Sequence, residues 1–206
     1  MTKVIVATSN AHKAQELETM LNLKSFSLQT MKEAGLTSDP IEDAPDFTGN
    51  ALIKARAAYA ECKDKGIDAC VLADDSGICV DALGGEPGVL SARYAGVNAG
   101  QDAINKKLFK KLEDVKFEDR TAHFSCALAF IDEQGKEIVV EGVVNGRIGF
   151  EPIGEDGFGY DPIFFPDEYN YEKTFGQVSA DEKNKISHRA RAVDLLREKL
   201  EELGYC

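Results

Sequence analysis

The sequence has too few basic residues for a protein that binds nucleic acid. Among its 206 residues, 24 lysines and arginines stand against 36 aspartates and glutamates, which leaves a formal net charge of −12. Proteins that bind duplex DNA or RNA neutralise phosphates with clustered lysines and arginines, so we expect no nucleic-acid partner. A small phosphorylated ligand is still compatible with this charge, because a divalent cation can screen carboxylates from phosphate.

The sequence also lacks the patterns of secreted, zinc-stabilised and membrane proteins. Its five cysteines are widely spaced and form no C-x-x-C pair, which indicates neither a disulfide framework nor a structural zinc site. The first residues contain no apolar run of the roughly seven or more residues found in a secretory signal. No run elsewhere approaches the ~20 residues of a membrane helix. We therefore expect a cytoplasmic protein with no membrane partner.

Repeats, low-complexity tracts and Pro/Ser-rich linkers are absent as well, and a chain of this length favours a single domain over residues 1–206. Strand-like and helix-like patterns alternate early in the chain. Two strand-like runs at 121–131 and 137–144 then predict a hairpin, at about 120–145, in a β-rich lobe. This order of elements predicts an α/β fold with a mixed β-sheet.

Hydrophobic patterning predicts the remaining elements. Continuous apolar runs predict buried strands at 4–7 and 69–73, and alternation predicts a short strand at 26–30. Helical spacing predicts one helix after an N-cap at Asn10 and others near 47–65, 102–112 and 190–203. The acidic segment 35–46 and the Gly- and aromatic-rich segment 157–162 are predicted to be loops.

The segment Thr8-Ser9-Asn10-Ala11-His12-Lys13 lies where a buried strand meets a helix. Free backbone amides at a helix start, together with the helix dipole, form a site for anions. Thr8, Ser9 and Asn10 add hydrogen bonds there, and Lys13 adds a cation. The alternative is a simple N-cap with an exposed lysine. Neither a Walker G-x-x-x-x-G-K-[ST] motif nor a G-x-G-x-x-G motif occurs here, which disfavours the common phosphate-loop folds.

Two adjacent carboxylates, Asp74 and Asp75, follow the second buried strand. Ligands bind outside the carboxyl ends of strands in open α/β sheets, and Mg²⁺ takes one or two protein oxygens and completes its shell with water and phosphate. The pair therefore predicts a Mg²⁺ site, with an Asx-type turn as the alternative. The acidic loop 41–46 is by itself typical of solvated surface, but it could supply a second carboxylate to the same metal.

Two further segments carry groups that suit a nucleobase. Phe158-Gly159-Tyr160-Asp161 places two aromatic residues around a glycine, which suits base stacking; the alternative is a turn whose aromatic side chains fill the core. Lys183 and the segment Ser187-His188-Arg189 are rich in donors that could read carbonyl oxygens on a ring. The alternative for the second segment is a basic helix start, which the helix dipole disfavours.

These segments, taken in order, resemble the RdgB-like family of non-canonical purine nucleoside triphosphate pyrophosphatases. The motifs that carry the resemblance extend over nearly the whole chain and are Thr8-Ser9-Asn10-Ala11-His12-Lys13, Phe47-x-x-Asn50-Ala51-x-x-Lys54-Ala55, Ala73-Asp74-Asp75-Ser76-Gly77, Ala82-Leu83-Gly84-Gly85-x-Pro87-Gly88, Ser91-Ala92-Arg93-Tyr94, Gly157-Phe158-Gly159-Tyr160-Asp161-Pro162 and Ser187-His188-Arg189. Each motif is weak alone, and their order makes the resemblance specific.

The resemblance implies Mg²⁺-dependent hydrolysis of ITP, dITP and XTP to the monophosphate and pyrophosphate, by a homodimer. It also implies an elongated mixed sheet flanked by helices, with two lobes around a central nucleotide-binding cleft. Asp75 matches the catalytic acid/base and a metal ligand, and Glu42 matches the other metal ligand. The remaining matches are substrate contacts: Thr8, Ser9, Asn10, Ala11, His12, Lys13 and Lys54 for the triphosphate, Ser76 for the nucleotide, and Phe158, Gly159, Tyr160, Asp161, Lys183, His188 and Arg189 for the nucleoside and base.

Three other functions stay open at this point. The first is a pyrophosphatase that acts on ordinary or otherwise modified nucleotides. The second is a nucleotide-binding module without catalysis, and the third is a Ca²⁺-dependent carbohydrate-binding domain that uses the acidic loops. The third gives no reason for Lys13 and Arg189.

Overall fold

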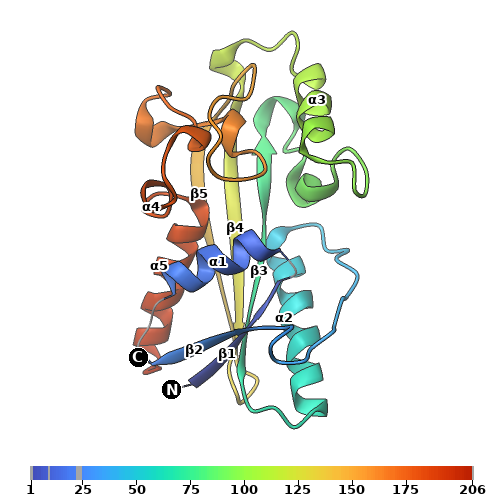
Figure 1. Cartoon of the computed structure of the whole chain (residues 1–206), viewed down its shortest axis with the longest axis vertical. Coiled ribbons are helices and arrows are strands. Elements are labelled where there is room, and N and C mark those ends of the chain that lie inside the picture. Colours follow the sequence, from blue (N-terminus) through green and yellow to red (C-terminus); the bar gives the residue numbers. More distant parts are fainter. Residues whose placement is uncertain (1, 9, 22–24, 206) are drawn as a thin grey trace. The chain divides into compact units, whose positions relative to one another are not determined.

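The structure is a computed structural model that describes residues 2–8, 10–21 and 25–205. A six-stranded sheet has the order β2-β1-β3-β4-β5-β6 (Figure 1). The strands are β1 (Thr2–Ala7), β2 (Phe26–Thr30), β3 (Cys70–Val80), β4 (Thr121–Ile131), β5 (Glu137–Ile148) and β6 (Phe164–Pro166). The helices are α1 (Ala11–Met20), α2 (Phe47–Asp64), α3 (Gln101–Lys111), α4 (Ala180–Lys183) and α5 (His188–Glu202), with short 3₁₀ turns between them.

The sheet is mixed, as the sequence predicts. β1 pairs in parallel with both β2 and β3, whereas β5 and β6 are antiparallel. The parallel ladder between β1 and β3 ends where Ala7 lies beside Ala73. The residues that follow this last pair, Thr8 and Asp74, are thus at the carboxyl edge of the parallel part of the sheet, which is where α/β proteins bind ligands. The α/β fold with a mixed sheet flanked by helices is confirmed. The two lobes and the cleft stay predictions.

The chain divides into two compact units. Unit 1 contains Met1–Asp75, Cys126–Gly142 and Arg189–Cys206, and unit 2 contains Ser76–Ser125 and Val143–His188. Because β3, β4 and β5 are long, each of them contributes residues to both units. The prediction of a single domain over the whole chain stays a prediction.

Unit 1 has a hydrophobic core between strands and two helices. Leu72 of β3 and Leu128 of β4 pack in one buried cluster with Leu17 of α1 and Leu196 of α5. Side chains alternate between the faces of a strand, so Asp74, two residues after Leu72, lies on the face that carries α1 and α5. Asp75 lies on the opposite face. This alternation places two neighbouring carboxylates in different surroundings.

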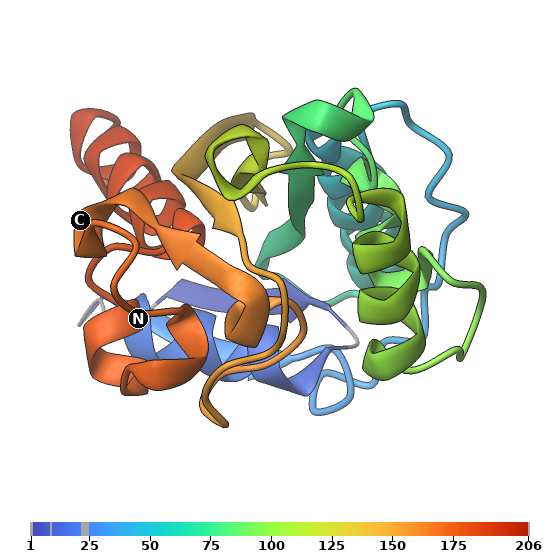
Figure 2. The same cartoon turned by 90° about the horizontal axis from the view of Figure 1, so that it is seen from above.

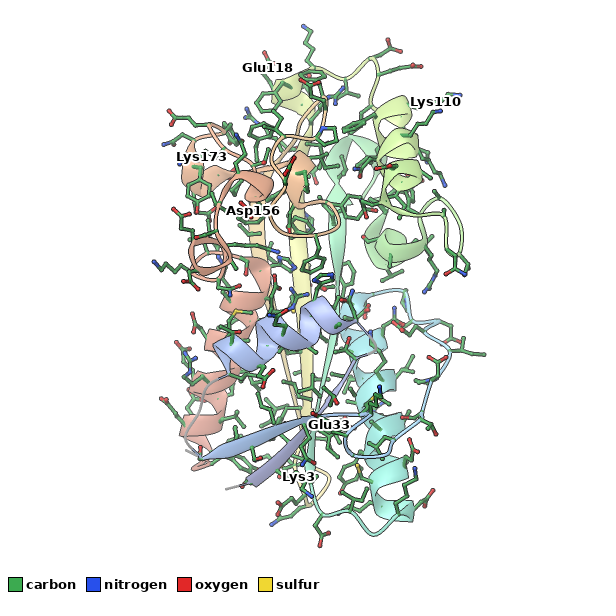
Figure 3. The ribbon with its side chains drawn as sticks, viewed as in Figure 1. Lys3, Glu33, Lys110, Glu118, Asp156 and Lys173 are labelled. Atoms are coloured by element: carbon green, nitrogen blue, oxygen red, sulfur yellow. The ribbon has the colours of Figure 1, made fainter. Side chains whose placement is uncertain are left out.

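Unit 2 has its own core and a long segment with little regular structure. Ile78, Phe124, Tyr160 and Phe175 belong to one buried cluster. Figure 2 shows the orange segment at about 150–185 winding through loops and short helical turns. Charged side chains of this unit such as Lys110 and Glu118 point outward (Figure 3).

The observed elements correct some predicted boundaries. β3 continues through the acidic pair to Val80 instead of ending at 73, because Ile78 and Val80 are fully buried and extend the strand beyond its polar centre. β5 continues to Ile148, and α5 begins at His188, two residues earlier than predicted. The short strand β6 is not predicted. Within the described residues, no helix has the length and apolarity needed to cross a membrane.

Candidate functional site

The start of α1 is capped as predicted. The Asn10 side-chain oxygen accepts hydrogen bonds from the backbone amides of His12 at 3.0 Å and of Lys13 at 3.3 Å, and the Thr8 hydroxyl accepts from the Asn10 amide at 3.2 Å. These two first-turn amides, which the sequence suggests are open to an anion, already have a partner in Asn10. Ala11 and His12 are exposed. Ser9, also predicted to contact the triphosphate, lies outside the described residues.

Asp74 is the centre of a buried charge cluster. Its side chain is fully buried, with Oδ1 lying 2.6 Å from the Lys13 ammonium and Oδ2 accepting from Arg189 Nε at 3.0 Å. The Cys126 thiol also donates to Oδ2, at 3.0 Å. Burial would raise the pKa of Asp74, but the charges of Arg189 and Lys13 hold this pKa well below its usual value. Asp74 is therefore a carboxylate anion, and Lys13 is no simple exposed cap residue.

Arg189 lies at the first turn of α5 and is almost fully buried. Besides Asp74, it donates to Glu16 of α1 through Nη1. Burial would lower the pKa of Arg189, but Asp74 in particular raises it above its already high value. A cation at a helix start is opposed by the dipole, and here two carboxylates offset that opposition. Sequence reasoning missed Glu16, although its spacing of three residues from Lys13 on one helix is a signal that could have found it.

Asp75 lies in a different environment. The Lys54 ammonium donates to its Oδ1 at 2.8 Å and to Glu42 Oε2 at 3.0 Å. Asp75 Oδ2 is buried and accepts no hydrogen bond within the described part of the chain. Burial raises the pKa of Asp75 above its usual value, although Lys54 opposes this shift. Burial would likewise lower the pKa of Lys54, but Asp75 and Glu42 raise it.

The arrangement around Asp75 fits a hard divalent cation. Two carboxylates already share one positive group, and a buried oxygen of Asp75 has no partner among the described residues. Across the described ranges, no set of three or more His, Cys, Asp or Glu side chains is placed to hold a metal. A site with one or two protein oxygens is typical of Mg²⁺, which takes its other ligands from water and substrate phosphate.

The loop that carries Glu42 is held by the start of α2. Asn50 is buried, and its Oδ1 accepts from the Ala44 amide at 3.0 Å. Asp46 caps α2 by accepting from the Gly49 amide at 2.7 Å. A Cβ at Gly49 would lie 2.5 Å from the Ala44 Cβ, so this position excludes any side chain. Sequence reasoning gave Asn50 no role, although it stands one helical turn before Lys54.

A second group of predicted residues lies in unit 2. The Lys183 ammonium lies 2.7 Å from Asp161 Oδ2, and both side chains are almost fully buried. The same oxygen accepts from the Phe158 amide at 2.7 Å, and the ammonium lies 4.5 Å from the centroid of the Phe158 ring. Gly157 has a φ of +74°, and a Cβ there would lie 2.3 Å from Asp161 Oδ2. This close approach explains why a glycine precedes Phe158.

The other predicted residues of unit 2 differ in accessibility. Tyr160 is buried in the core, and its hydroxyl donates to the Ser91 carbonyl at 2.7 Å, so its ring fills the core as the alternative interpretation holds. His188 is buried and stacks on Phe124, with ring centroids 4.7 Å apart. Phe158, Gly159 and Ser76 are half-buried.

The contacts therefore join predicted residues into three groups, two within unit 1 and one within unit 2. Unit 1 brings Asp74, Lys13 and Arg189 together, and Asp75 with Lys54 and Glu42. Unit 2 brings together Lys183, Asp161 and Phe158. The roles given to these residues by resemblance stay predictions.

Comparisons with known proteins identify the family. The chain is 42% identical over 201 residues to the dITP/XTP pyrophosphatase of Clostridium perfringens, covering 97% of this chain and 98% of the relative. It is 43% identical over 202 residues to the dITP/XTP pyrophosphatase of Bacillus subtilis, covering 98% of each. Among solved structures, the Ham1 protein of Staphylococcus aureus matches with a TM-score of 0.84 at 36% identity, covering 98% of this chain and 99% of that one.

The motif resemblance and these relatives agree. The profile of the Ham1 family matches residues 4–199, which is nearly the span of the motifs. The resemblance derived from the motifs is confirmed, and the chain belongs to the Ham1 family.

Proposed function

We propose that this protein hydrolyses the non-canonical purine nucleoside triphosphates dITP, ITP and XTP to the nucleoside monophosphate and pyrophosphate, and so removes them from the nucleotide pool. Relatives at 42–44% identity over almost the full chain are dITP/XTP pyrophosphatases. The structural observation that carries the proposal is Asp75, a buried carboxylate with one oxygen on Lys54 and the other without a partner within the described residues.

Glu42 and Asp75 are the residues that would hold a divalent cation, and Mg²⁺ matches their hard oxygen donors. The cation, when bound, supplies charge neutralisation for the phosphate oxygens. Lys54 is placed between the two carboxylates and keeps them close together. Lys13 and Lys54 add positive charge for a triphosphate that carries about −4 at neutral pH.

Asp75 is the general base of the proposed reaction. A water molecule attacks the α-phosphorus and loses a proton to the carboxylate, and pyrophosphate leaves with the electron pair of the broken P–O bond. The raised pKa of Asp75 increases its strength as a base.

Hydrogen-bond chemistry accounts for the choice of hypoxanthine and xanthine over adenine. Hypoxanthine and xanthine carry a 6-oxo acceptor where adenine carries a 6-amino donor. Arg189 is a donor, so the amino group of adenine would face another donor there. Each such unpaired buried group costs about 1–3 kcal/mol, and sites of this kind can discriminate by about 10⁴-fold or more. We also propose that the half-buried Phe158 ring stacks on the base and that the enzyme acts in the cytoplasm as a homodimer.

A panel assay tests the proposal. Pyrophosphate release would be measured with dITP, ITP, XTP, GTP and ATP, with and without Mg²⁺. We expect release from dITP, ITP and XTP but not from ATP, and only with the metal. Binding of dITP without release would instead indicate a nucleotide-binding module, and equal rates on ATP would indicate a pyrophosphatase of broader range. Light scattering after gel filtration tests the dimer.

A further inference from the structure

We propose that Asp74 is a positioning residue that holds Lys13 and Arg189 in place, and that it thereby sets both the affinity for the triphosphate and the preference for a 6-oxo purine. This inference rests on the proposed function. It concerns an aspartate that sequence reasoning grouped with Asp75 as a possible metal carboxylate. The structure separates the two residues by face and by partner.

The contacts of Asp74 argue against a direct chemical role. Oδ1 lies 2.6 Å from the Lys13 ammonium, and Oδ2 accepts from Arg189 Nε and from the Cys126 thiol, each at 3.0 Å. The side chain is fully buried. A carboxylate with both oxygens committed to three donors has little capacity left to accept a proton from water or to hold a metal.

The same contacts suit a positioning role. Lys13 comes from α1 and Arg189 from α5, helices that are far apart in the sequence. Both side chains are long and flexible, and an ion pair with one buried anion restricts each of them to a narrow range of positions. A single carboxylate therefore fixes two cations that the resemblance assigns to opposite ends of the nucleotide.

Asp74→Asn tests this role with a side chain of the same shape. Asparagine has one acceptor oxygen, so its NH₂ group must face either Lys13 or Arg189, donor against donor. We expect the KM for dITP to rise at least about 10-fold while kcat changes less than about 3-fold. We also expect the ratio of kcat/KM for dITP over dATP to fall at least about 10-fold.

Asp75→Asn should change kcat more than KM, the opposite of Asp74→Asn, and it serves as the internal reference. Its kcat should fall on the order of 10²-fold or more with little change in KM. Leu72→Ala controls for a general loss of core packing. Leu72 is almost fully buried on the same strand and face as Asp74, but it belongs to the hydrophobic cluster. We expect Leu72→Ala to lower Tm without changing the dITP preference. If it changes the preference as much as Asp74→Asn does, the positioning role is wrong.

Glu16→Gln keeps the inference testable if Asp74→Asn does not fold. Glu16 binds Arg189 and its side chain is more exposed than that of Asp74. We expect this variant to fold and to lose about 3-fold or more of the preference for dITP over dATP. An unchanged preference in a folded Glu16→Gln protein would contradict the role of this cluster in base selection.

A further measurement separates failure of this inference from failure of the proposed function. If the wild-type protein releases no pyrophosphate from dITP, the proposed function is wrong. The positioning role is then judged by calorimetric binding of inorganic tripolyphosphate to the folded proteins. Asp74→Asn must weaken this binding at least about 10-fold. Equal binding by the wild-type and variant proteins, or no binding to either, overturns the inference.

Discussion

Asp74 and Asp75 are neighbours on β3, yet their surroundings shift the pKa of each carboxyl in opposite directions. Burial would raise both values. Two cations, Arg189 and Lys13, reverse this effect for Asp74, whereas Lys54 reduces it for Asp75 without cancelling it. The alternation of side chains along a strand is the cause, because one carboxylate meets α1 and α5 and the other meets α2.

Two neighbouring residues of one short motif can therefore have different roles, one structural and one suited to chemistry. Asp74 has every oxygen committed to a donor, so it acts as a permanent counter-ion. Asp75 keeps a buried oxygen without a partner in the described residues, which is the feature a base or a metal ligand needs. The residue type does not distinguish the two. The face of β3 on which each side chain lies, and the contacts that it makes there, distinguish them.

The largest expected effect is a loss of stability when Asp74 loses its partner Arg189. Arg189→Ala leaves the buried Asp74 and the half-buried Glu16 with less positive charge, so the free energy of unfolding should fall by about 3–5 kcal/mol. Urea denaturation followed by circular dichroism measures this loss. The matched control is Arg56→Ala, which removes a bidentate but exposed pair with Glu137. That change should cost about 0–1 kcal/mol. Equal losses for the two variants would show that burial does not distinguish these ion pairs.

Substitution of Asp75 should lower activity strongly without lowering stability. Asp75→Asn should lower kcat on the order of 10²-fold or more while Tm stays the same or rises, because burying this carboxylate is unfavourable. Steady-state pyrophosphate release and thermal denaturation measure the two quantities. A variant with near-native turnover would remove Asp75 from the mechanism.

Removal of divalent cations should affect turnover and stability differently. Chelation should lower turnover by about 10²-fold or more, since the metal carries much of the charge neutralisation. It should leave Tm nearly unchanged, because Lys54 already pairs with both Glu42 and Asp75 in the protein alone. Differential scanning calorimetry with and without EDTA checks the second part. A large fall in Tm would indicate a structural metal.

The smallest effect comes from a third carboxylate, Glu61, which is half-buried near the end of α2. A hydrogen bond from Lys65, with others from the Thr37 and Ser38 amides, lowers the pKa of Glu61 to about 2. Its ionised form therefore stabilises the fold at pH values above the ordinary pKa of 4.5. This contribution is lost as pH falls from about 4.5 towards about 2. Glu61→Gln should flatten that part of the curve of Tm against pH, and an unchanged curve would contradict this account.

Local patterning explains most of the fold. The boundaries of β2, α2 and β4 follow from alternation, periodicity and turn residues almost to the residue. β3 is longer than predicted because its centre, Asp74 to Gly77, looks like a turn. Gly77 is required for another reason: a Cβ there would lie 2.4 Å from the Ser91 hydroxyl oxygen and 2.7 Å from the Gly88 carbonyl oxygen. Such a close approach depends on chain segments that the local pattern does not include.

The sequence predicts which residues belong to the candidate site, but it does not predict which side chains contact one another. The sequence predicts that Asp75 and Glu42 serve one metal ion, and in the structure both carboxylates contact Lys54. Tertiary packing decides the partners of Arg189, which lies against Asp74 and Glu16. Its contact with a base stays a prediction. Cys126 gave no signal, because a buried cysteine on a strand reads as an apolar residue.

The ladder between β1 and β3 has a consequence for how this sequence can change. Its pairing fixes Ala73 beside Ala7, and a shift of β3 by one residue would turn every side chain to the other side of the sheet. Asp74 would then face α2, and Asp75, the proposed catalytic carboxylate, would take the place of the buried counter-ion beside α1 and α5. Insertions and deletions in the first half of this strand should therefore be far more damaging than substitutions.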